Sequence, residues 1–297
     1  MELRRIKIFG TNEVIGKKFF RDAPKDSLFV TSMFFTLQGE GPYAGQAALF
    51  IRLAKCNLDC SFCDTFFDDG DWMTFAQIEN KMYDTINSYW DDKGQEVPNW
   101  AFDNNLNHPG VVLVMTGGEP LLQENISVFM AEQLPHFKAV QVESNGIPDT
   151  VVPEGVTLVC SPKCMEKEGK AVKYYSPSKT ILDRADCLKF VMSAETDSPY
   201  NTVPQWAHDW KERTGKDIYC SPMNIYNSFP QKIKLLRAEK GAITMAERST
   251  VDEVISFWEH GLLNQHANQD NHEYTARYCM DHGFKLNLQM HLYASIA

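Results

Sequence analysis

The sequence predicts an α/β protein with a mostly parallel sheet and helices outside it. Short apolar runs alternate with helical stretches through the middle of the chain, a pattern typical of parallel sheets whose connecting helices pack outside. Four motifs rich in glycine, cysteine or polar residues follow directly after such runs. Ligands bind at the carboxyl ends of strands in sheets of this kind. We therefore expect motifs far apart in the sequence to meet at one site.

The strands are expected where apolar residues form short runs bounded by turn residues. Residues 47–54 are almost continuously apolar, which is typical of a strand buried on both faces. The expected strands are residues 31–37, 47–54, 111–115, 139–143, 156–160, 187–192, 218–221 and 285–292.

The clearest helix is predicted over residues 74–90, where apolar side chains recur at helical spacing. Thr74 is expected to cap its N-terminus, because a threonine hydroxyl can accept a hydrogen bond from an unpaired backbone N–H. The face of this helix comprises Phe75, Ile78, Met82, Ile86 and Tyr89. Other helices are expected from Pro120 to about Leu134, once within residues 194–216, and over residues 244–260, with a loop over residues 91–109.

The chain is expected to form one main domain with an extension before it. Residues 1–30 are mixed in charge and carry no chemical motif, so they are assigned to an N-terminal extension. Residues 31–297 form the main domain, with insertions expected near residues 84–110 and 194–245. Hydrophobic residues make up 43% of the chain, which is enough for a core that needs no disulfides.

The charge balance is acidic, with 29 basic and 39 acidic side chains and a formal charge of −10. An acidic surface repels phosphate backbones and anionic lipids, so we expect neither nucleic-acid nor membrane binding. No apolar run reaches the roughly 18–20 residues that cross a bilayer. The first residues also lack the apolar stretch of a secretory signal, so a cytoplasmic protein is predicted.

Three cysteines lie on one short segment, with the spacing C-x3-C-x2-C: Cys56, Cys60 and Cys63. Three thiolates can bind three irons of a cubane 4Fe-4S cluster and leave the fourth iron open to a ligand. A zinc site completed by a distant cysteine or histidine, and inert buried thiols, are the alternative interpretations. Five further cysteines lack this spacing and are expected to be buried thiols rather than a second cluster: Cys160, Cys164, Cys187, Cys220 and Cys279.

A second motif, residues 116–120, reads Thr-Gly-Gly-Glu-Pro directly after a predicted strand. Two glycines allow the backbone to approach a ligand closely. The carboxylate of Glu119 could accept the amino group of S-adenosylmethionine (SAM). The alternative is a tight turn between strand and helix, with Pro120 in the first helical turn.

Two polar runs, residues 68–71 and residues 268–271, resemble calcium-binding loops in composition. Neither has the glutamate spacing of an EF-hand, so both are expected to be solvated loops.

The cysteine motif and the Gly-Gly-Glu-Pro motif together resemble the radical SAM superfamily. An ordered set of further motifs is similar to the 7-carboxy-7-deazaguanine synthase (QueE) family, over about residues 31–297. These motifs are Leu-Gln-Gly-Glu-Gly at 37–41, Cys-Asp-Thr at 63–65, Glu-Ser-Asn-Gly at 143–146, Ser-Pro-Lys at 161–163 and Leu-Gln-Met-His at 288–291.

The resemblance implies an incomplete (β/α) barrel and a specific reaction. Family members convert 6-carboxy-tetrahydropterin to 7-carboxy-7-deazaguanine with loss of ammonia, using a 4Fe-4S cluster, SAM and Mg2+. The cluster splits SAM to a 5′-deoxyadenosyl radical that abstracts hydrogen from C6 of the pterin. The resemblance also implies an electron donor such as flavodoxin or ferredoxin, and short chains of this kind often form homodimers.

The family pattern also assigns residues. The substrate would be held by Leu37, Gln38, Gly39, Arg52 and Thr116. SAM would be bound by Phe62, Cys63, Asp64, Gly118, Glu119, Ser144, Ser161, Pro162 and Lys163, with Glu143 and Asn145 as further contacts. Thr65 would bind the Mg2+ ion, although by itself it would be interpreted as a helix N-cap.

The residue chemistry agrees with several of these roles. Arg52 offers a fork of donors for a carboxylate, and an unpaired charge on so apolar a strand would be costly. Gln38 can donate to and accept from a pterin amide edge. Lys163 could neutralise the SAM carboxylate, or be an ordinary solvated lysine. His291 could face the substrate or be a core histidine.

The sequence departs from the family pattern at a few positions. Lys55 stands where many relatives carry glycine, and Ser221-Pro222-Met223 replaces a Gln-Pro block. A radical SAM activase that forms a glycyl radical on a partner enzyme, and a non-catalytic regulator, therefore stay as alternative functions.

Overall fold

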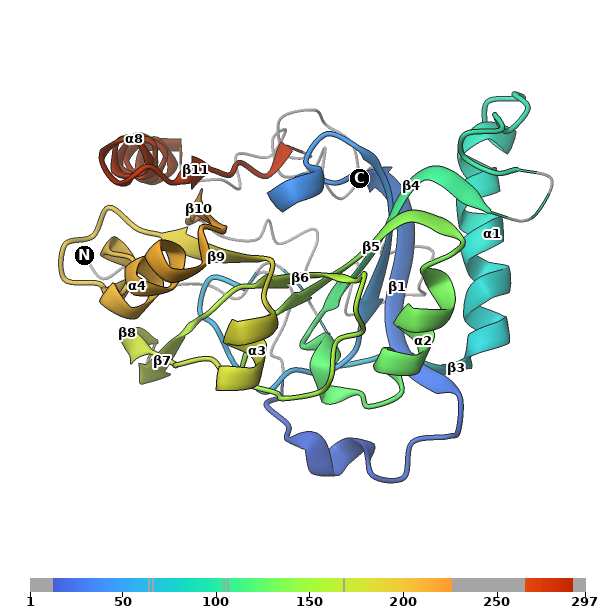
Figure 1. Cartoon of the computed structure of the whole chain (residues 1–297), viewed down its shortest axis with the longest axis horizontal. Coiled ribbons are helices and arrows are strands. Elements are labelled where there is room, and N and C mark those ends of the chain that lie inside the picture. Colours follow the sequence, from blue (N-terminus) through green and yellow to red (C-terminus); the bar gives the residue numbers. More distant parts are fainter. Residues whose placement is uncertain are drawn as a thin grey trace, which may run out of the picture.

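The computed structural model describes residues 13–63, 65, 67–103, 105, 107–167, 169–225 and 265–290. Within them, nine strands form one curved sheet in the order β11-β10-β9-β6-β5-β4-β2-β1-β3 (Figure 1). The strands are β1 (Ser27–Leu37), β2 (Ala47–Leu53), β3 (Asp71–Thr74), β4 (His108–Gly117), β5 (Phe137–Ser144), β6 (Thr157–Cys160), β9 (Cys187–Met192), β10 (Asp217–Pro222) and β11 (Lys285–Leu286). The predicted α/β class is confirmed.

Seven of these strands run parallel to one another, from β2 through β11. β1 is antiparallel to β2, and β3 is antiparallel to β1. In the described part of the chain β11 and β3 are the two ends of the sheet and do not pair with each other. The sheet is therefore open, as expected of an incomplete barrel.

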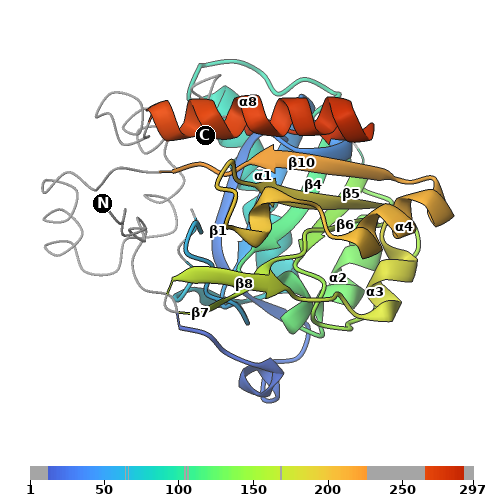
Figure 2. The same ribbon diagram turned by 90° about the vertical axis from the view of Figure 1, so that its left-hand side faces the viewer.

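Helices cover the outer face of the curved sheet (Figures 1 and 2). The described helices are α1 (Phe75–Asp91), α2 (Ile126–Gln133), α3 (Lys179–Arg184), α4 (Gln205–Thr214) and α8 (Gln265–His282). Their apolar side chains and those of the strands form one continuous core between helices and sheet. The outer face is thus packed, which leaves the concave face for a site.

The start of α1 follows the sequence prediction closely. The Thr74 hydroxyl accepts a hydrogen bond from the backbone N–H of Gln77 at 3.3 Å, and the Gln77 side chain accepts one from Thr74 N–H at 2.8 Å. This reciprocal capping box satisfies two backbone donors at the helix terminus. The buried face of α1 has Trp90, whereas Tyr89, which was assigned to that face, is exposed.

Several elements differ from the sequence prediction. β1 begins at Ser27, so the last four residues of the expected extension belong to the sheet. Strand β3, helix α3 and a hairpin of β7 (Cys164–Lys167) and β8 (Lys170–Tyr174) were not predicted. The expected last strand, residues 285–292, is wrong over residues 287–290, because Asn287 turns its side chain toward Gly41 and Ser221. Residues 291 and 292 lie outside the described residues. The helix expected over residues 244–260 lies outside the described residues.

The interpretation of residues 268–271 as a solvated loop is wrong, because they lie within α8. Asn271 is buried and donates to the backbone carbonyl of Met223, while its carbonyl oxygen accepts from Ala194 N–H, both at 2.8 Å. Asn268 makes the same pair of bonds with Ile225. These amides hold the ends of β9 and β10 against α8, which lies along β10 in Figure 2.

The interpretation of residues 68–71 as a solvated loop is also wrong in part. Asp71 is the first residue of β3. The Asp68 side chain is 21% exposed, lies 3.6 Å from the ammonium of Lys55 and accepts a hydrogen bond from Glu13 N–H. Asp68 therefore supports the start of the cysteine loop, whereas Asp71 is exposed to solvent.

The end of β4 contacts the cysteine loop backbone to backbone. The N–H of Gly118 donates to Leu53 O, and the N–H of Glu119 donates to Lys55 O, both at 2.9 Å. A Cβ at Gly117 would lie 2.2 Å from Leu53 N, and one at Gly118 would lie 1.9 Å from Lys55 O. The two glycines are therefore required by contact with the chain itself, whereas the sequence suggested contact with a ligand.

Lys55 adopts the left-handed backbone conformation, with φ of 73°. This explains why glycine suits the position before the first cysteine, because a side chain there is strained by about 1–2 kcal/mol. Hydrogen bonds hold the strained backbone on both sides, from Lys55 N–H to Phe67 O and from Glu119 N–H to Lys55 O. The Lys55 ammonium also lies 5.5 Å from the ring centroid of Phe19.

The strain at Lys55 is testable with two variants that both lose the side-chain contacts. We expect Lys55→Gly to be more stable than Lys55→Ala by about 1 kcal/mol, because only glycine adopts this conformation without strain. Chemical denaturation of both variants measures the difference. Equal stability, or a more stable alanine variant, would show that the backbone at this position is not strained.

Candidate active site

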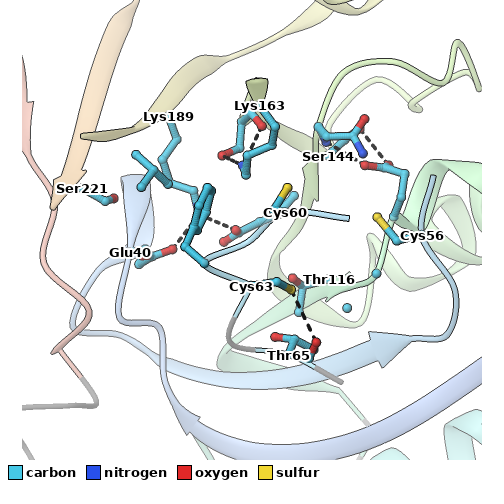
Figure 3. A pocket seen from close by; sticks show the side chains of 18 of the residues that line it. Glu40, Cys56, Cys60, Cys63, Thr65, Thr116, Ser144, Lys163, Lys189 and Ser221 are labelled. Atoms are coloured by element: carbon cyan, nitrogen blue, oxygen red, sulfur yellow. Dashed lines mark hydrogen bonds and ion pairs between the residues drawn. The ribbon is translucent and has the colours of Figure 1, made fainter. Parts of the chain in front are cut away.

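A cavity of about 270 Å3 lies where strands of the parallel sheet end at their carboxyl termini (Figure 3). The size is near the lower end of the range of small-molecule sites. Its lining comes from segments after β2, β4, β5, β6 and β10, which are far apart in the sequence. The lining includes these residues singled out by the sequence: Gln38, Gly39, Arg52, Cys56, Cys60, Phe62, Cys63, Thr65, Thr116, Gly118, Glu119, Glu143, Ser144, Asn145, Ser161 and Lys163.

The remaining residues singled out by the sequence are placed differently. Leu37, at the end of β1, and Pro162, which is buried beside Ser161, do not line the cavity. Asp64 and His291 lie outside the described residues. The five cysteines beyond the motif are all buried thiols, as predicted.

The cysteine loop brings its three thiols to the same cavity, at the end of β2. The backbone N–H of Leu58 donates to the sulfur of Cys56 at 3.4 Å, and the N–H of Cys63 donates to Cys60 O at 3.1 Å. From the β7–β8 hairpin, the carboxylate of Glu166 accepts from Ser61 N–H at 3.0 Å. The loop is therefore held by hydrogen bonds within itself and from the β7–β8 hairpin.

Cys56 is buried at this loop. Burial, and then the negative charge of Glu119, raise the pKa of the Cys56 thiol well above its ordinary value. The Leu58 N–H directed at its sulfur is of the kind found around iron–sulfur ligands, and three thiols on one short loop are the number that a cluster with an open iron requires. The cysteine loop therefore fits a 4Fe-4S cluster.

Within the described residues, no three His, Cys, Asp or Glu side chains converge on one point that could hold a single metal ion. A structural zinc ion needs four ligands around one centre. The cubane differs, because its cysteines bind three separate irons and need not converge on one point. Three cysteines on one short loop match the number of irons that such a cubane binds through the protein.

Glu119 is 1% exposed and already accepts three hydrogen bonds. The donors are Leu121 N–H at 3.0 Å, the Ser144 hydroxyl at 2.8 Å and Asn145 N–H at 2.7 Å. A carboxylate has about four acceptor positions, so room for one further donor is left. Glu119 therefore ties the turn after β4 to the turn after β5, and one donor of a ligand can still bind it.

Lys163 presents an ammonium to the cavity from the segment after β6 (Figure 3). Its bonds within the described chain go to the carbonyl and hydroxyl oxygens of Ser161, at 2.7 and 2.6 Å. No described carboxylate lies within ion-pair distance of it, and burial lowers its pKa. An ammonium in this setting is suited to the carboxylate of a ligand.

Arg52 and Thr116 lie opposite each other in the β2–β4 ladder, and both line the cavity. The Arg52 guanidinium carbon lies 4.7 Å from the ring centroid of Phe34, which stacks on Phe50 with centroids 5.1 Å apart. A flat aromatic platform orients a guanidinium and is favourable in a partly dry site. The Arg52 guanidinium is therefore positioned over an aromatic ring at the border of the cavity.

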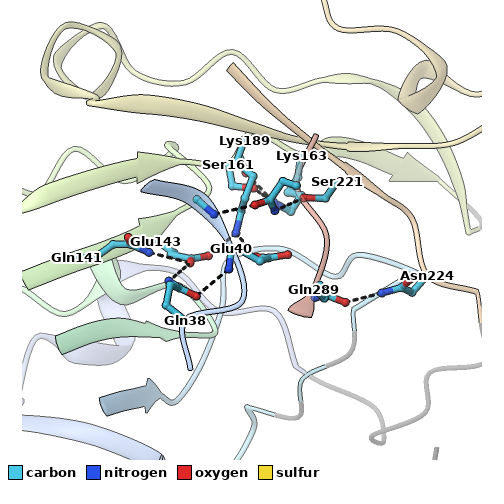
Figure 4. A network of polar contacts seen from close by, with 12 residues as sticks. Gln38, Glu40, Gln141, Glu143, Ser161, Lys163, Lys189, Ser221, Asn224 and Gln289 are labelled. Atoms are coloured by element: carbon cyan, nitrogen blue, oxygen red, sulfur yellow. Dashed lines mark hydrogen bonds and ion pairs between the residues drawn. The ribbon is translucent and has the colours of Figure 1, made fainter. Parts of the chain in front are cut away.

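A second charged group, which the sequence analysis missed, contains Lys189 and Glu40 (Figure 4). The Lys189 ammonium lies 2.6 Å from a Glu40 oxygen and 2.5 Å from a Glu143 oxygen. The other oxygen of Glu143 accepts from the amides of Gln38 at 3.4 Å and Gln141 at 3.1 Å. The sequence did contain a signal for Lys189, because a charged residue within the apolar run 187–192 is costly to bury without a partner. The same argument singled out Arg52.

Hydrogen bonds link the cavity across the open side of the sheet. Gly41 N–H donates to the Asn287 carbonyl oxygen, and the Asn287 amide donates to the Ser221 hydroxyl, both at 2.7 Å. Gly41 follows β1, near one end of the sheet, whereas Ser221 and Asn287 lie in β10 and after β11 at the other. The two ends are thus joined by side chains instead of a strand ladder.

Glu119 makes the stability of the metal-free protein dependent on pH. Burial raises its pKa to about 7, although the three hydrogen-bond donors oppose this. The folded protein therefore holds a proton that the unfolded chain has released, so the stability present at low pH is lost as pH rises through about 7.

We expect the free energy of unfolding to fall by roughly 3 kcal/mol between about pH 4.5 and 8 on account of Glu119. Glu119→Gln removes the titration, so its stability changes less over this interval. Urea denaturation at several pH values measures both curves. Parallel curves for the two proteins would show that Glu119 does not titrate in this range.

None of the described helices combines the length and the apolar character that a bilayer span requires.

No family model matches the chain. A solved structure, QueE from Escherichia coli, aligns with 93% of this chain and 99% of its own, at 16% identity and a TM-score of 0.49.

Several curated relatives carry the name 7-carboxy-7-deazaguanine synthase. The protein of that name from Rickettsia prowazekii is 28% identical over 98% of this chain and 96% of its own length. Those from Rhodospirillum rubrum and Methanospirillum hungatei are 31% and 32% identical, over 66% and 71% of this chain and 71% and 78% of their own lengths. The chain belongs to the 7-carboxy-7-deazaguanine synthase family.

Proposed function

We propose that this chain converts 6-carboxy-5,6,7,8-tetrahydropterin to 7-carboxy-7-deazaguanine with release of ammonia, as a radical SAM carbon–nitrogen lyase. One observation carries the proposal: the three-cysteine loop, the Gly-Gly-Glu-Pro turn and Arg52 line one cavity in a chain of this family. No feature of the described residues favours a glycyl-radical activase or a non-catalytic regulator over this reaction.

Cys56, Cys60 and Cys63 would hold a 4Fe-4S cluster through three irons. When bound and reduced, the cluster supplies the electron that splits SAM into methionine and a 5′-deoxyadenosyl radical. Lys163 is placed to pair with the methionyl carboxylate, and the last acceptor position of Glu119 is suited to the methionyl ammonium. Ser161 holds the Lys163 ammonium in place.

The substrate carboxylate would bind Arg52, whose guanidinium carbon lies 4.7 Å from the ring centroid of Phe34. The opposite end of a pterin carries a ring N–H and an amino group, which are hydrogen-bond donors. Glu40 and Glu143 offer acceptors for that end, and Gln38 can both donate and accept. The cavity therefore has donors for one end of the substrate and acceptors for the other.

The finer details extend this proposal. Thr65 lines the cavity beside Cys63 and would bind Mg2+ together with the substrate. The reaction requires an external electron donor, for which a flavodoxin or ferredoxin is suited. We further propose a cytoplasmic enzyme that acts as a homodimer.

The central test is product formation under anaerobic conditions. Protein reconstituted with iron and sulfide, given SAM, Mg2+, dithionite and 6-carboxy-tetrahydropterin, is expected to release 7-carboxy-7-deazaguanine and ammonia. Cys56→Ala is expected to reduce product at least 1,000-fold, as loss of a reactive group does. Cys279→Ala, which removes a buried thiol on α8, serves as the matched control. SAM cleavage without this product would reject the substrate.

Arg52 gives a second prediction, which concerns substrate affinity. We expect Arg52→Lys to raise KM for the pterin about 10- to 100-fold, because a point charge replaces a bidentate fork. SAM cleavage in the absence of substrate should be unaffected. Steady-state kinetics measure KM for the pterin, and release of 5′-deoxyadenosine measures SAM cleavage. An unchanged KM would remove Arg52 from the substrate site.

A further inference from the structure

Lys189 has an unusual position for a lysine in the middle of a parallel strand. Its side chain is 8% exposed, and its ammonium contacts two carboxylates from different elements. Glu143 belongs to β5, and Glu40 to the turn after β1. A buried charge is tolerated only when it is paired and hydrogen-bonded, and this pairing meets that condition.

The group formed by Glu40, Lys189 and Glu143 borders the cavity and not the apolar core. The Glu40 oxygen that does not contact Lys189 has no hydrogen-bond donor among the described residues. Both glutamates retain acceptor capacity toward the cavity, since each carboxylate has about four acceptor positions. In an ion pair with only a structural role, we would expect these remaining acceptor positions to be filled by donors of the protein.

Two carboxylates so close to one ammonium would repel each other without it. In that case one of them would take up a proton, as paired buried carboxylates do. A protonated carboxyl group presents an O–H donor where the intact group presents an acceptor. The hydrogen-bond pattern offered to a ligand would therefore change, in addition to the charge.

We propose that Lys189 is a positioning residue, which holds Glu40 and Glu143 as paired acceptors for the 2-amino-pyrimidinone edge of the substrate. The inference rests on the proposed function for the identity of the substrate. The new element concerns specificity at pterin position 2. There the site would select an amino group over an oxygen, and this selection would depend on Lys189 even though Lys189 need not contact the ligand. A binding site rejects an analogue strongly when its buried polar groups are left mispaired.

Other titratable groups surround Lys189 and bear on any pH effect. Lys163 approaches from the segment after β6, Cys187 lies two residues earlier on β9, and Tyr219 is its register neighbour on β10. Burial disfavours the charge of Lys189, but Glu143 and Glu40 outweigh it, so its pKa is raised. Lys189 therefore stays charged throughout the neutral range.

The test compares two stable ligands by calorimetry on SAM-bound protein at several pH values. The first is 6-carboxypterin, and the second is the analogue with oxygen in place of the 2-amino group. We expect the wild type to prefer 6-carboxypterin by about 100-fold or more. Lys189→Met should reduce this preference to less than about tenfold, with affinity that varies between pH 6 and 8. Lys189→Arg should keep the wild-type preference for 6-carboxypterin, because the charge stays between the two carboxylates.

The control variant is Lys285→Met, the same substitution at an exposed lysine that pairs with Asp217 on β10. It should bind both ligands as the wild type does. If Lys189→Met does not fold, Lys189→Gln is measured instead, because it keeps a hydrogen-bond donor for the two carboxylates but carries no charge. A ligand preference below about tenfold in Lys189→Gln supports the proposal, and a retained wild-type preference overturns it.

Retained preference in Lys189→Met, or a wild type that does not distinguish the two ligands, overturns the inference. The proposed function fails separately, if the wild type binds and discriminates the ligands but forms no 7-carboxy-7-deazaguanine. Product formation together with unchanged discrimination in Lys189→Met rejects the role of Lys189 alone.

Discussion

The structure depends on one close contact between two backbones, at the ends of β2 and β4. Glu119 N–H donates to Lys55 O, and the glycines before it leave no space for a Cβ. The contact fixes the loop that carries the three cysteines against the turn that carries Glu119. Glu119 in turn accepts from the turn after β5. Three strand ends are thereby locked together around one cavity, and a shift in any of them would move the others.

The charges of the cavity are arranged by the same strand ends. Lys163 and Arg52 contribute cations to the cavity. The Lys163 ammonium donates to oxygens of Ser161, and the Arg52 guanidinium lies over the ring of Phe34. Glu40 and Glu143 present acceptors, with Lys189 between them. Ligands that each carry a carboxylate and N–H donors would be oriented by these groups before any chemistry begins. Such preorganisation reduces the entropy that binding must offset.

The sequence was most informative where a rule is local. The spacing of Cys56, Cys60 and Cys63 predicted a cluster loop, and these cysteines do line the cavity. The capping residue Thr74 placed the start of α1 to within one residue. Parallel-strand logic then placed these cysteines with Thr116 and Ser161 at one edge of the sheet, which the cavity confirms. The individual roles assigned to the site residues remain predictions.

The sequence was least informative where tertiary contacts override composition. Asn268 and Asn271 are polar, but they are buried on α8 because they pair with the backbone after β9 and β10. Lys189 lies within an apolar run, and nothing local shows that Glu40, 149 residues away, is its partner. Asn287 ends β11 early by bonding across the open sheet. Such long-range pairings cannot be read from periodicity.

The central claim is that three thiols hold a cluster whose fourth iron faces the same cavity as Lys163 and Arg52. Electron paramagnetic resonance of the anaerobically reconstituted, reduced protein tests this most directly. The account predicts the signal of a single reduced 4Fe-4S cluster, which changes shape when SAM is added. A protein that takes up no cluster, or a cluster signal that SAM leaves unchanged, would contradict it.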